Sequence, residues 1–213
     1  MPDYSLETEL GARDDRIIVG LDEAGRGPWA GPVVAAAVCL SPDAAESPAF
    51  EHLNDSKKLT ASRRTALCEA IRNSCGCGIG QASVEEIDKL NILQASMLAM
   101  ERAVAELGVA PHAALVDGLH APALPCPHRA LPRADGLSLS VAAASVLAKV
   151  TRDRLMEELD ESCPGYHWAR NRGYGTAEHR RALERLGPSR YHRRSFRPIQ
   201  ELVSGLENKT VTG

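Results

Sequence analysis

The stretch IIVGLDEAGRGPWAGPVVAAAVCL, residues 17–40, decides the fold because it places two aliphatic runs on either side of a segment rich in glycine and proline. Residues 17–22 and 33–40 have the length and the β-branched or aliphatic character of buried strands. The glycines and prolines between them must turn the chain. The stretch therefore predicts two neighbouring strands, the first of which ends at an acidic pair, Asp22 and Glu23.

Strand-like and helical segments alternate along the rest of the chain. A short apolar run at 113–116 predicts a further strand, another is expected between 73 and 80, and a strand-like end recurs at Asp135. Helical spacing of apolar positions marks four segments: 60–72, 83–107, 141–159 and 176–186. This alternation predicts one α/β domain with helices covering a sheet.

The composition indicates a compact domain without a membrane segment. Of the 213 residues, 44% are hydrophobic and only 4% aromatic, so aliphatic residues and alanine must fill the core. The apolar runs are far shorter than the roughly 20 residues that span a bilayer. The acidic amino terminus lacks a secretory signal, so we expect a cytoplasmic protein. The expected organisation is an acidic extension at 1–15, a compact domain at 16–199 and a loose polar tail at 200–213.

The six cysteines are dispersed, which fits a reducing compartment. Cys75 and Cys77 flank a glycine and could suggest a metal site, but no second Cys or His pair follows at zinc-finger spacing. Because a structural zinc ion needs four ligands, we expect these thiols to be structural.

The net charge of −3 hides a strong asymmetry. Between residues 164 and 198, nine arginines stand against two glutamates, whereas the remainder of the chain is acidic. Guanidinium groups pair bidentately with phosphate, and their binding releases condensed counterions. The segment therefore favours a nucleic-acid partner, with a solvated, arginine-rich helix face as the alternative.

Carboxylates follow three strand-like ends. Asp22 and Glu23 close the first run, Asp117 closes the run ALVD, and Asp135 closes ALPRAD. Adjacent carboxylates at the end of an apolar strand are costly to bury unless a cation compensates them. Oxygen ligands without Cys or His select Mg²⁺ or Mn²⁺. For Asp117 or Asp135 alone, an ordinary Asp-Gly turn is the alternative.

Seven segments in order resemble the ribonuclease HII family, also called type 2 ribonuclease H, and the resemblance extends from residue 17 to residue 198. The most specific of them are DEAGRG and GYGT. The segments are IIVGLDEAGRGPWAGPVVAAAV at 17–38, LNDSKKL at 53–59, EEIDKLNILQASMLAM at 85–100, LVDG at 115–118, AASVLAKVTRD at 143–153, GYGTAEH at 173–179 and HRRSFRP at 192–198.

The resemblance implies a ribonuclease H-like mixed central sheet flanked by helices, with a helical C-terminal segment. It implies hydrolysis of RNA in RNA-DNA hybrids and incision 5′ of single ribonucleotides in duplex DNA, giving 5′-phosphate and 3′-hydroxyl ends. The four acidic residues of the family fall on Asp22, Glu23, Asp117 and Asp135. They would hold two Mn²⁺ or Mg²⁺ ions, one to activate water and one to stabilise the departing 3′-oxygen.

The resemblance also assigns substrate contacts. The family's junction-reading motif falls on Gly25, Arg26 and Gly27, whose backbone could sense a 2′-hydroxyl, which is both donor and acceptor. The family's tyrosine falls on Tyr174, which would stack on the deoxyribose after the ribonucleotide. Basic residues in the matched motifs are expected to contact phosphates: Lys57, Lys149, Arg152, Arg172 and Arg194.

Two other functions share part of this pattern. A non-catalytic hybrid-binding module would use the arginines but not the clustered carboxylates, which repel phosphate unless metals intervene. A junction resolvase or integrase would use the carboxylates but gives no reason for the glycines at 25 and 27. His179 is expected to be an ordinary imidazole near the arginines rather than a general acid.

The expected partners are RNA-DNA hybrids and duplex DNA that contains ribonucleotides, with no membrane. The sequence after residue 200 has no aromatic pair, so no clamp-binding peptide is evident. We expect a monomer.

Overall fold

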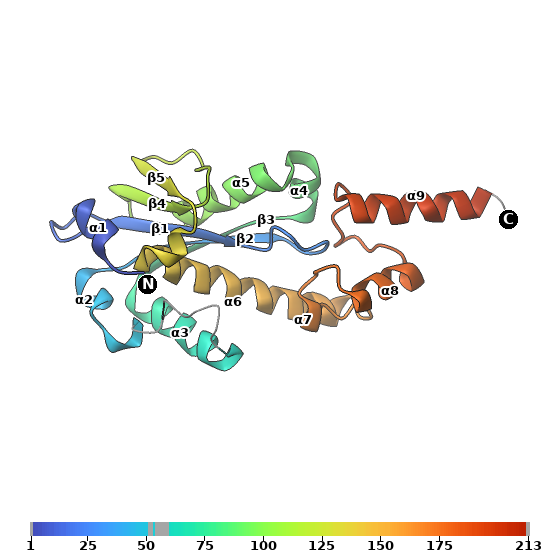
Figure 1. Cartoon of the computed structure of the whole chain (residues 1–213), viewed down its shortest axis with the longest axis horizontal. Helices are drawn as coiled ribbons and strands as arrows, with labels where there is room; N and C mark the ends of the chain where they lie inside the picture. Colours follow the sequence, from blue (N-terminus) through green and yellow to red (C-terminus); the bar gives the residue numbers. More distant parts are fainter. Residues whose placement is uncertain (1, 51–52, 54–59, 212–213) are drawn as a thin grey trace.

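The computed structural model describes residues 2–50, 53 and 60–211. Its centre is a mixed sheet of five strands in the order β3-β2-β1-β4-β5 (Figure 1). The first three strands along the chain pair antiparallel, and the last two run parallel to β1. The strands are β1 (Ile18–Ala24), β2 (Val33–Cys39), β3 (Gly76–Ala82), β4 (Ala113–Asp117) and β5 (His128–Leu131).

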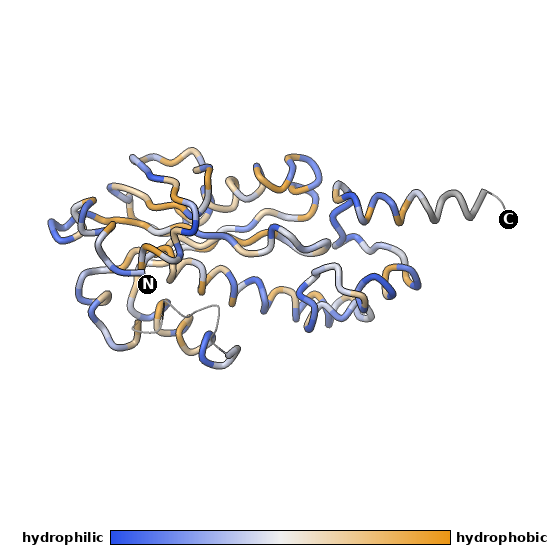
Figure 2. The backbone as a smooth tube through the Cα atoms, viewed as in Figure 1, coloured by the Kyte–Doolittle hydropathy of each residue, from blue (hydrophilic) through white to orange (hydrophobic). Residues whose placement is uncertain are grey.

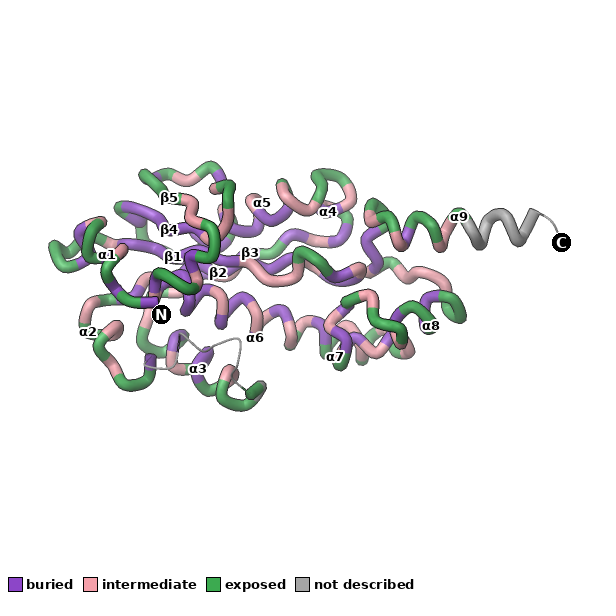
Figure 3. Tube along the Cα trace, viewed as in Figure 1, coloured by how far each residue is buried: buried purple, intermediate pink, exposed green. Residues whose placement is uncertain are grey.

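Helices cover both faces of the sheet. On one face α6 (Leu139–Ser162) packs against β1 and β2, and α3 (Ala61–Ser74) packs against α6. On the other face α5 (Ile92–Ala105) lies across β2 and β3, with α4 (Val84–Leu90) beside it. Figure 1 shows the three layers, and Figure 3 shows buried residues concentrated on the strands and along α6. The predicted α/β class, with a mixed sheet and flanking helices, is confirmed.

Small residues set how closely the helices approach the sheet. A Cβ atom at Gly78 or Gly80 would overlap the backbone of α5, and one at Gly20 would overlap the backbone at Ser140 in α6. β2 is buried almost throughout and is composed only of valine, alanine and cysteine. Figure 2 shows this apolar composition along the central strands. Small side chains therefore replace aromatic ones as the means of close packing.

The helical region predicted at 83–107 is interrupted. Asn91 adopts φ 71°, ends α4, and its side chain accepts hydrogen bonds from the backbone N–H groups of Leu93 and Gln94 at the start of α5. Asparagine tolerates the left-handed region and is a good N-cap, so one residue both stops one helix and starts the next.

The segment after α6 forms a smaller cluster at one end of the sheet (Figure 1). Trp168, Leu183 and Ile199 lie at its centre and are fully buried. The segment expected to be a loose tail is helical from Arg197, so that expectation is wrong. The helices are α7 (Trp168–Asn171), α8 (Ala177–Leu186) and α9 (Arg197–Val211).

The amino-terminal extension expected at 1–15 instead belongs to the domain. Helix α1 (Ser5–Glu9) places Glu7 in the interior, where its Oε1 accepts hydrogen bonds from Ser138 Oγ (2.6 Å), Ser140 N (2.9 Å) and Ser140 Oγ. The Tyr4 hydroxyl donates to the Leu40 carbonyl at 2.6 Å. The extension thus caps the start of α6.

The remaining short elements are α2 (Pro42–Ala45) and the 3₁₀ turns η1 (Pro48–Phe50) and η3 (Ala134–Gly136). All six cysteines are free in the structure. Within the described ranges, every helix is too short or too polar to cross a bilayer.

Glu7→Ala is expected to lower the free energy of unfolding by about 3 kcal/mol, because it leaves buried hydroxyl and amide donors without an acceptor. Glu9→Ala is the matched control on the same helix. Glu9 forms an exposed ion pair with Arg129 at 3.0 Å, and such pairs contribute less than about 1 kcal/mol. Urea unfolding of both variants measures the difference. Equal losses would mean that Glu7 does not cap α6.

Candidate active site

The register of two parallel strands brings carboxylates together. Leu21 of β1 is paired with Val116 of β4 in the ladder. The next residues, Asp22 and Asp117, therefore follow at the same edge of the sheet, the carboxyl ends of both strands. Glu23 comes directly after Asp22 within β1. Three of the four predicted carboxylates thus meet because of how the central strands pair.

Asp135 reaches this edge by a different route from the one expected. It does not end a strand, because β5 ends at Leu131 and Asp135 lies half-buried in η3. Asp117 Oδ1 accepts a hydrogen bond from the backbone N–H of Ala134 at 2.7 Å, which ties this turn to the end of β4. The strand-like end predicted at Asp135 is therefore wrong, although the residue is tethered beside Asp117.

The carboxyl groups of the acidic pair have perturbed acidities. Burial raises the pKa of Asp22 well above its usual range, the negative charges of Glu23 and Asp117 raise it further, and a hydrogen bond from Ser145 of α6 opposes the shift. Burial also raises the pKa of Glu23, and Arg26, whose Nη1 lies 3.0 Å from Glu23 Oε1, opposes it. Ionising both groups here needs additional positive charge.

The donor set fits a hard divalent cation. Glu23 Oε2 is buried and has no hydrogen-bond partner among the residues that the structure describes, which is costly for a carboxylate oxygen and is relieved when the oxygen binds a metal. Among the described residues, no group of three or more His, Cys, Asp or Glu side chains is arranged so that it could hold an ion by itself. Mg²⁺ commonly uses one or two carboxylates and completes its shell with water and substrate phosphate.

A pocket of about 410 Å³ is lined at one side by Glu23 of the acidic pair. A Cβ atom at Gly27 would lie 3.5 Å from the ring of Tyr174, so the glycine loop and this half-exposed tyrosine share one wall. The pocket is lined by Glu23, Ala24, Gly25, Arg26, Gly27, Arg64, Ser145, Val146, Lys149, Arg152 and Tyr174.

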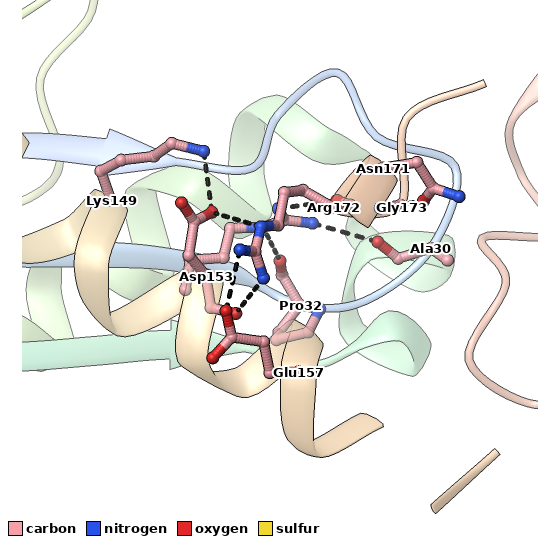
Figure 4. A network of polar contacts seen from close by, with 9 residues as sticks. Ala30, Pro32, Lys149, Asp153, Glu157, Asn171, Arg172 and Gly173 are labelled. Atoms are coloured by element: carbon pink, nitrogen blue, oxygen red, sulfur yellow. Dashed lines mark hydrogen bonds and ion pairs between the residues drawn. The ribbon is translucent and has the colours of Figure 1, made fainter. Parts of the chain in front are cut away.

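The basic residues expected at phosphates separate into different environments. Lys149 lines the pocket and donates to Asp153 at 2.7 Å. Arg172 lies outside the pocket lining, where it pairs with Glu157 at 2.8 Å and donates to the Asp153 carbonyl (Figure 4). Arg194 is exposed and also lies outside the lining. Lys57 falls outside the described residues.

Arg152 does not have the surroundings expected of a phosphate contact. It is 1% exposed, and its nitrogens donate to the backbone carbonyls of Pro32 (3.0 Å), Ala30 (3.1 Å) and Arg172 (3.0 Å). Figure 4 shows these carbonyls around the network. Since every nitrogen already donates to the backbone, this arginine holds the chain and leaves phosphate to other residues.

The arginine-rich segment is similarly divided. Arg193 is fully buried, Arg172 and Arg197 pair with acids, and the Arg180 guanidinium lies 5.5 Å from the ring centre of Trp29. The segment is therefore neither one phosphate-binding face nor one solvated helix face, because part of it is internal structure.

His179 is buried, as expected for a structural imidazole. Its Nε2 lies 3.2 Å from Trp168 Nε1 and 3.0 Å from His192 Nε2, and its Nδ1 lies 2.9 Å from the Tyr174 carbonyl. Burial lowers the pKa of His179, which favours the neutral ring. The imidazole supports the backbone that carries Tyr174.

Ser145 and Arg64 are site residues that sequence reasoning missed. Both line the pocket, and Ser145 also bonds to Asp22. Ser145 lies in the matched segment at 143–153, so the resemblance could have pointed to it as a site residue. Arg64 lies in α3 outside every matched segment, so the sequence offered no such indication.

Comparison with known proteins identifies the family. The family model described as Ribonuclease HII matches residues 19–199. The chain is 54% identical over 203 residues to ribonuclease HII of Paramagnetospirillum magneticum, which covers 95% of this chain and 99% of the relative.

Solved structures share the fold. The ribonuclease in the PCNA:RNase HII complex from Archaeoglobus fulgidus is 27% identical, with a TM-score of 0.72 over 87% of this chain and 96% of that chain. Bst-RNase HIII in complex with Mn²⁺ is 19% identical, with a TM-score of 0.74 over 94% of this chain and 72% of that chain.

The family assignment excludes both the non-catalytic binding module and the junction resolvase or integrase. The chain belongs to the ribonuclease HII family, and it is a metal-dependent endonuclease that acts on RNA in RNA-DNA hybrids.

Proposed function

We propose that this enzyme also incises duplex DNA on the 5′ side of a single embedded ribonucleotide, leaving 5′-phosphate and 3′-hydroxyl ends. The observation that carries the proposal is the shared pocket, which joins Glu23 to Gly25–Gly27 and Tyr174. A site that serves both chemistry and junction recognition needs the acidic edge and the sugar-reading surface within one nucleotide step. Here Glu23 of the acidic edge lines the same pocket as Gly25–Gly27 and Tyr174.

The acidic residues Asp22, Glu23, Asp117 and Asp135 would hold two Mn²⁺ or Mg²⁺ ions. When bound, the ions supply activation of the attacking water and stabilisation of the charge on the departing 3′-oxygen. The raised pKa values of Asp22 and Glu23 and the unpartnered Glu23 Oε2 support this role, because both indicate carboxylates that lack positive charge.

The loop Gly25–Gly27 would read the ribose. Gly25 has φ 99°, and a Cβ atom there would overlap the Arg152 side chain, so only glycine fits. Without side chains at 25 and 27, a sugar can approach the backbone closely. Arg26 is half-exposed and pairs with Glu23 at 3.0 Å, so its guanidinium would contact a phosphate only through nitrogens outside this ion pair or after leaving it.

Tyr174 and the remaining cations would fix the following nucleotide and its backbone. Tyr174 is 47% exposed, which leaves a ring face for the deoxyribose 3′ of the ribonucleotide. Lys149 in the pocket and exposed Arg194 are suited to phosphate contacts. Arg172 would contact a phosphate only if its ion pair with Glu157 were broken.

Cleavage of three matched substrates tests the proposal. These are a duplex with one ribonucleotide, the same duplex entirely of DNA, and a long RNA-DNA hybrid, each with Mn²⁺, Mg²⁺ or chelator. We expect a metal-dependent cut 5′ of the lone ribonucleotide and none in the all-DNA duplex. Cleavage of the long hybrid alone would contradict the proposal and remove the junction roles of Gly25–Gly27 and Tyr174.

Asp22→Asn is expected to abolish turnover while hybrid binding at modest salt is retained. It should also raise the melting temperature of the metal-free protein at pH 8. A carboxyl with a raised folded-state pKa destabilises the fold increasingly as the pH rises from its ordinary pKa of 3.8 through the folded-state pKa, so the gain should shrink toward pH 4.

Calorimetry with chelator and with Mn²⁺ provides the measurement, and Asp14→Asn on the exposed surface is the control. Mn²⁺ should raise the melting temperature of the unmodified protein more than that of Asp22→Asn. An equal metal-dependent rise in both proteins would contradict the assignment of Asp22 as a metal ligand.

Tyr174→Ala is expected to lower kcat/KM for the single-ribonucleotide duplex at least about tenfold, roughly 1.4 kcal/mol of transition-state stabilisation, because it removes the stacking face. Tyr174→Phe keeps the ring and should stay close to the unmodified enzyme. Steady-state cleavage of the single-ribonucleotide duplex gives both values. If Tyr174→Ala cut this substrate at the normal rate, the stacking role would be wrong.

A further inference from the structure

Arg193 lies beneath the glycine loop, and among the described residues its guanidinium donates hydrogen bonds to backbone carbonyls alone. It is 0% exposed, and its Nη1 donates to the Arg26 carbonyl at 3.0 Å while its Nη2 donates to the Gly25 carbonyl at 2.6 Å. Further bonds run from Nε to the Gly31 carbonyl at 3.0 Å and from Nη2 to the Pro32 carbonyl at 3.2 Å. One side chain therefore hydrogen-bonds to both ends of residues 25–32, here called the 25–32 turn.

The second buried guanidinium, Arg152, connects this turn to the tyrosine. Besides its bonds to Ala30 and Pro32, it donates to the carbonyl of Arg172, two residues before Tyr174. The backbone N–H of Trp29 donates to the Gly173 carbonyl at 2.8 Å. The two surfaces proposed to read the junction are therefore joined through one side chain and one backbone bond.

Neither guanidinium has an acidic partner within ion-pair distance among the described residues. Burial lowers the pKa of Arg193 to about 9, and the neighbouring charge of Arg152 contributes; burial also lowers the pKa of Arg152 to about 10. The free-energy cost of burying a charged guanidinium is tolerated only when oxygen acceptors, here backbone carbonyls, satisfy its N–H donors. The carbonyls must then keep their positions, and this constrains the turn.

Arginine is the side chain that can do this. Its planar guanidinium presents five donors in a fixed fork, whereas a lysine ammonium presents three at one point. The carbonyls of Gly25, Arg26, Gly31 and Pro32 surround Arg193 along that fork. An ammonium in its place would keep the charge and lose the simultaneous bonds.

Backbone contacts of the C-terminal segment hold Arg193 beside the 25–32 turn. The Arg193 backbone N–H donates to the Trp29 carbonyl at 2.8 Å, and His192 forms an isolated β-bridge with Ala30. Asp88 accepts bonds from the backbone N–H groups of Arg194 at 2.9 Å and Ser195 at 2.8 Å. The segment is thus anchored on both sides of Arg193.

We propose that Arg193 and Arg152 are positioning residues for junction recognition: Arg193 fixes the 25–32 turn in its substrate-reading shape, and Arg152 sets its place relative to Tyr174. The inference rests on the proposed roles of Gly25–Gly27 and Tyr174. It adds that the specificity of the reaction depends on two residues that touch neither metal nor substrate.

Arg193→Lys tests the proposal against a merely structural role. We expect kcat/KM for the single-ribonucleotide duplex to fall at least tenfold more than kcat/KM for a long RNA-DNA hybrid, in a variant whose folding is verified by calorimetry. Arg197→Lys is the matched control, because Arg197 is exposed in the same segment and pairs with Glu201. Arg152→Lys should show the same selective loss. Equal losses on both substrates, or no loss, would overturn the proposal.

Amide hydrogen exchange decides the question even if neither lysine variant folds. In the free, unmodified enzyme the amides of Trp29 and Gly31, which donate to Gly173 and Tyr191, should exchange slowly, because the turn is already held. A folded Arg193→Lys should exchange faster at these two amides and unchanged at Ala36 in β2. Rapid exchange at Trp29 and Gly31 in the unmodified enzyme would overturn the proposal.

The two ideas can fail separately. If the unmodified enzyme does not incise the single-ribonucleotide duplex, the proposed function is wrong, and the exchange experiment still reports whether the turn is held. If it does incise that duplex and Arg193→Lys keeps the full preference for it, only the positioning roles are wrong.

Discussion

The parallel pairing of β1 with β4 is the constraint on which the site depends. It sets Asp22 beside Asp117 at one edge of the sheet, and a slip of one residue would move one of them to the other face. Gly20 allows α6 to touch β1 closely, and this approach brings Ser145 to Asp22. The bond from Ala134 to Asp117 then attaches the turn that carries Asp135. The positions of the acidic residues therefore depend first on the backbone register of β1 and β4.

The structure buries charge in two opposite ways around one pocket. Within the described part of the chain, Glu23 has one buried oxygen without a partner while its other oxygen pairs with Arg26, which fits the proposed binding of a cation. Arg152 and Arg193 are buried, and their guanidinium nitrogens donate to backbone carbonyls, so both side chains are held in place. The first arrangement suits binding, and the second suits a rigid frame for Gly25.

The sequence predicts the acidic edge well because strand patterns and strand ends are local signals. The runs at 17–22 and 33–40 match β1 and β2 closely, and Thr176 caps α8 as expected. Asp135 was misread because an Asp-Gly pair ends a strand and a 3₁₀ turn alike. The burial of Glu7 could not be foreseen, because the serines that donate hydrogen bonds to its carboxylate lie more than 130 residues away along the chain.

The segment HRRSFRP shows why a count of basic residues overstates the surface that meets nucleic acid. Adjacent Arg193 and Arg194 have opposite environments, one fully buried and the other exposed. The buried arginine donates to the carbonyls of Gly25 and Arg26, so its contribution to the proposed recognition of the junction comes through the shape of the turn and not through contact with a phosphate.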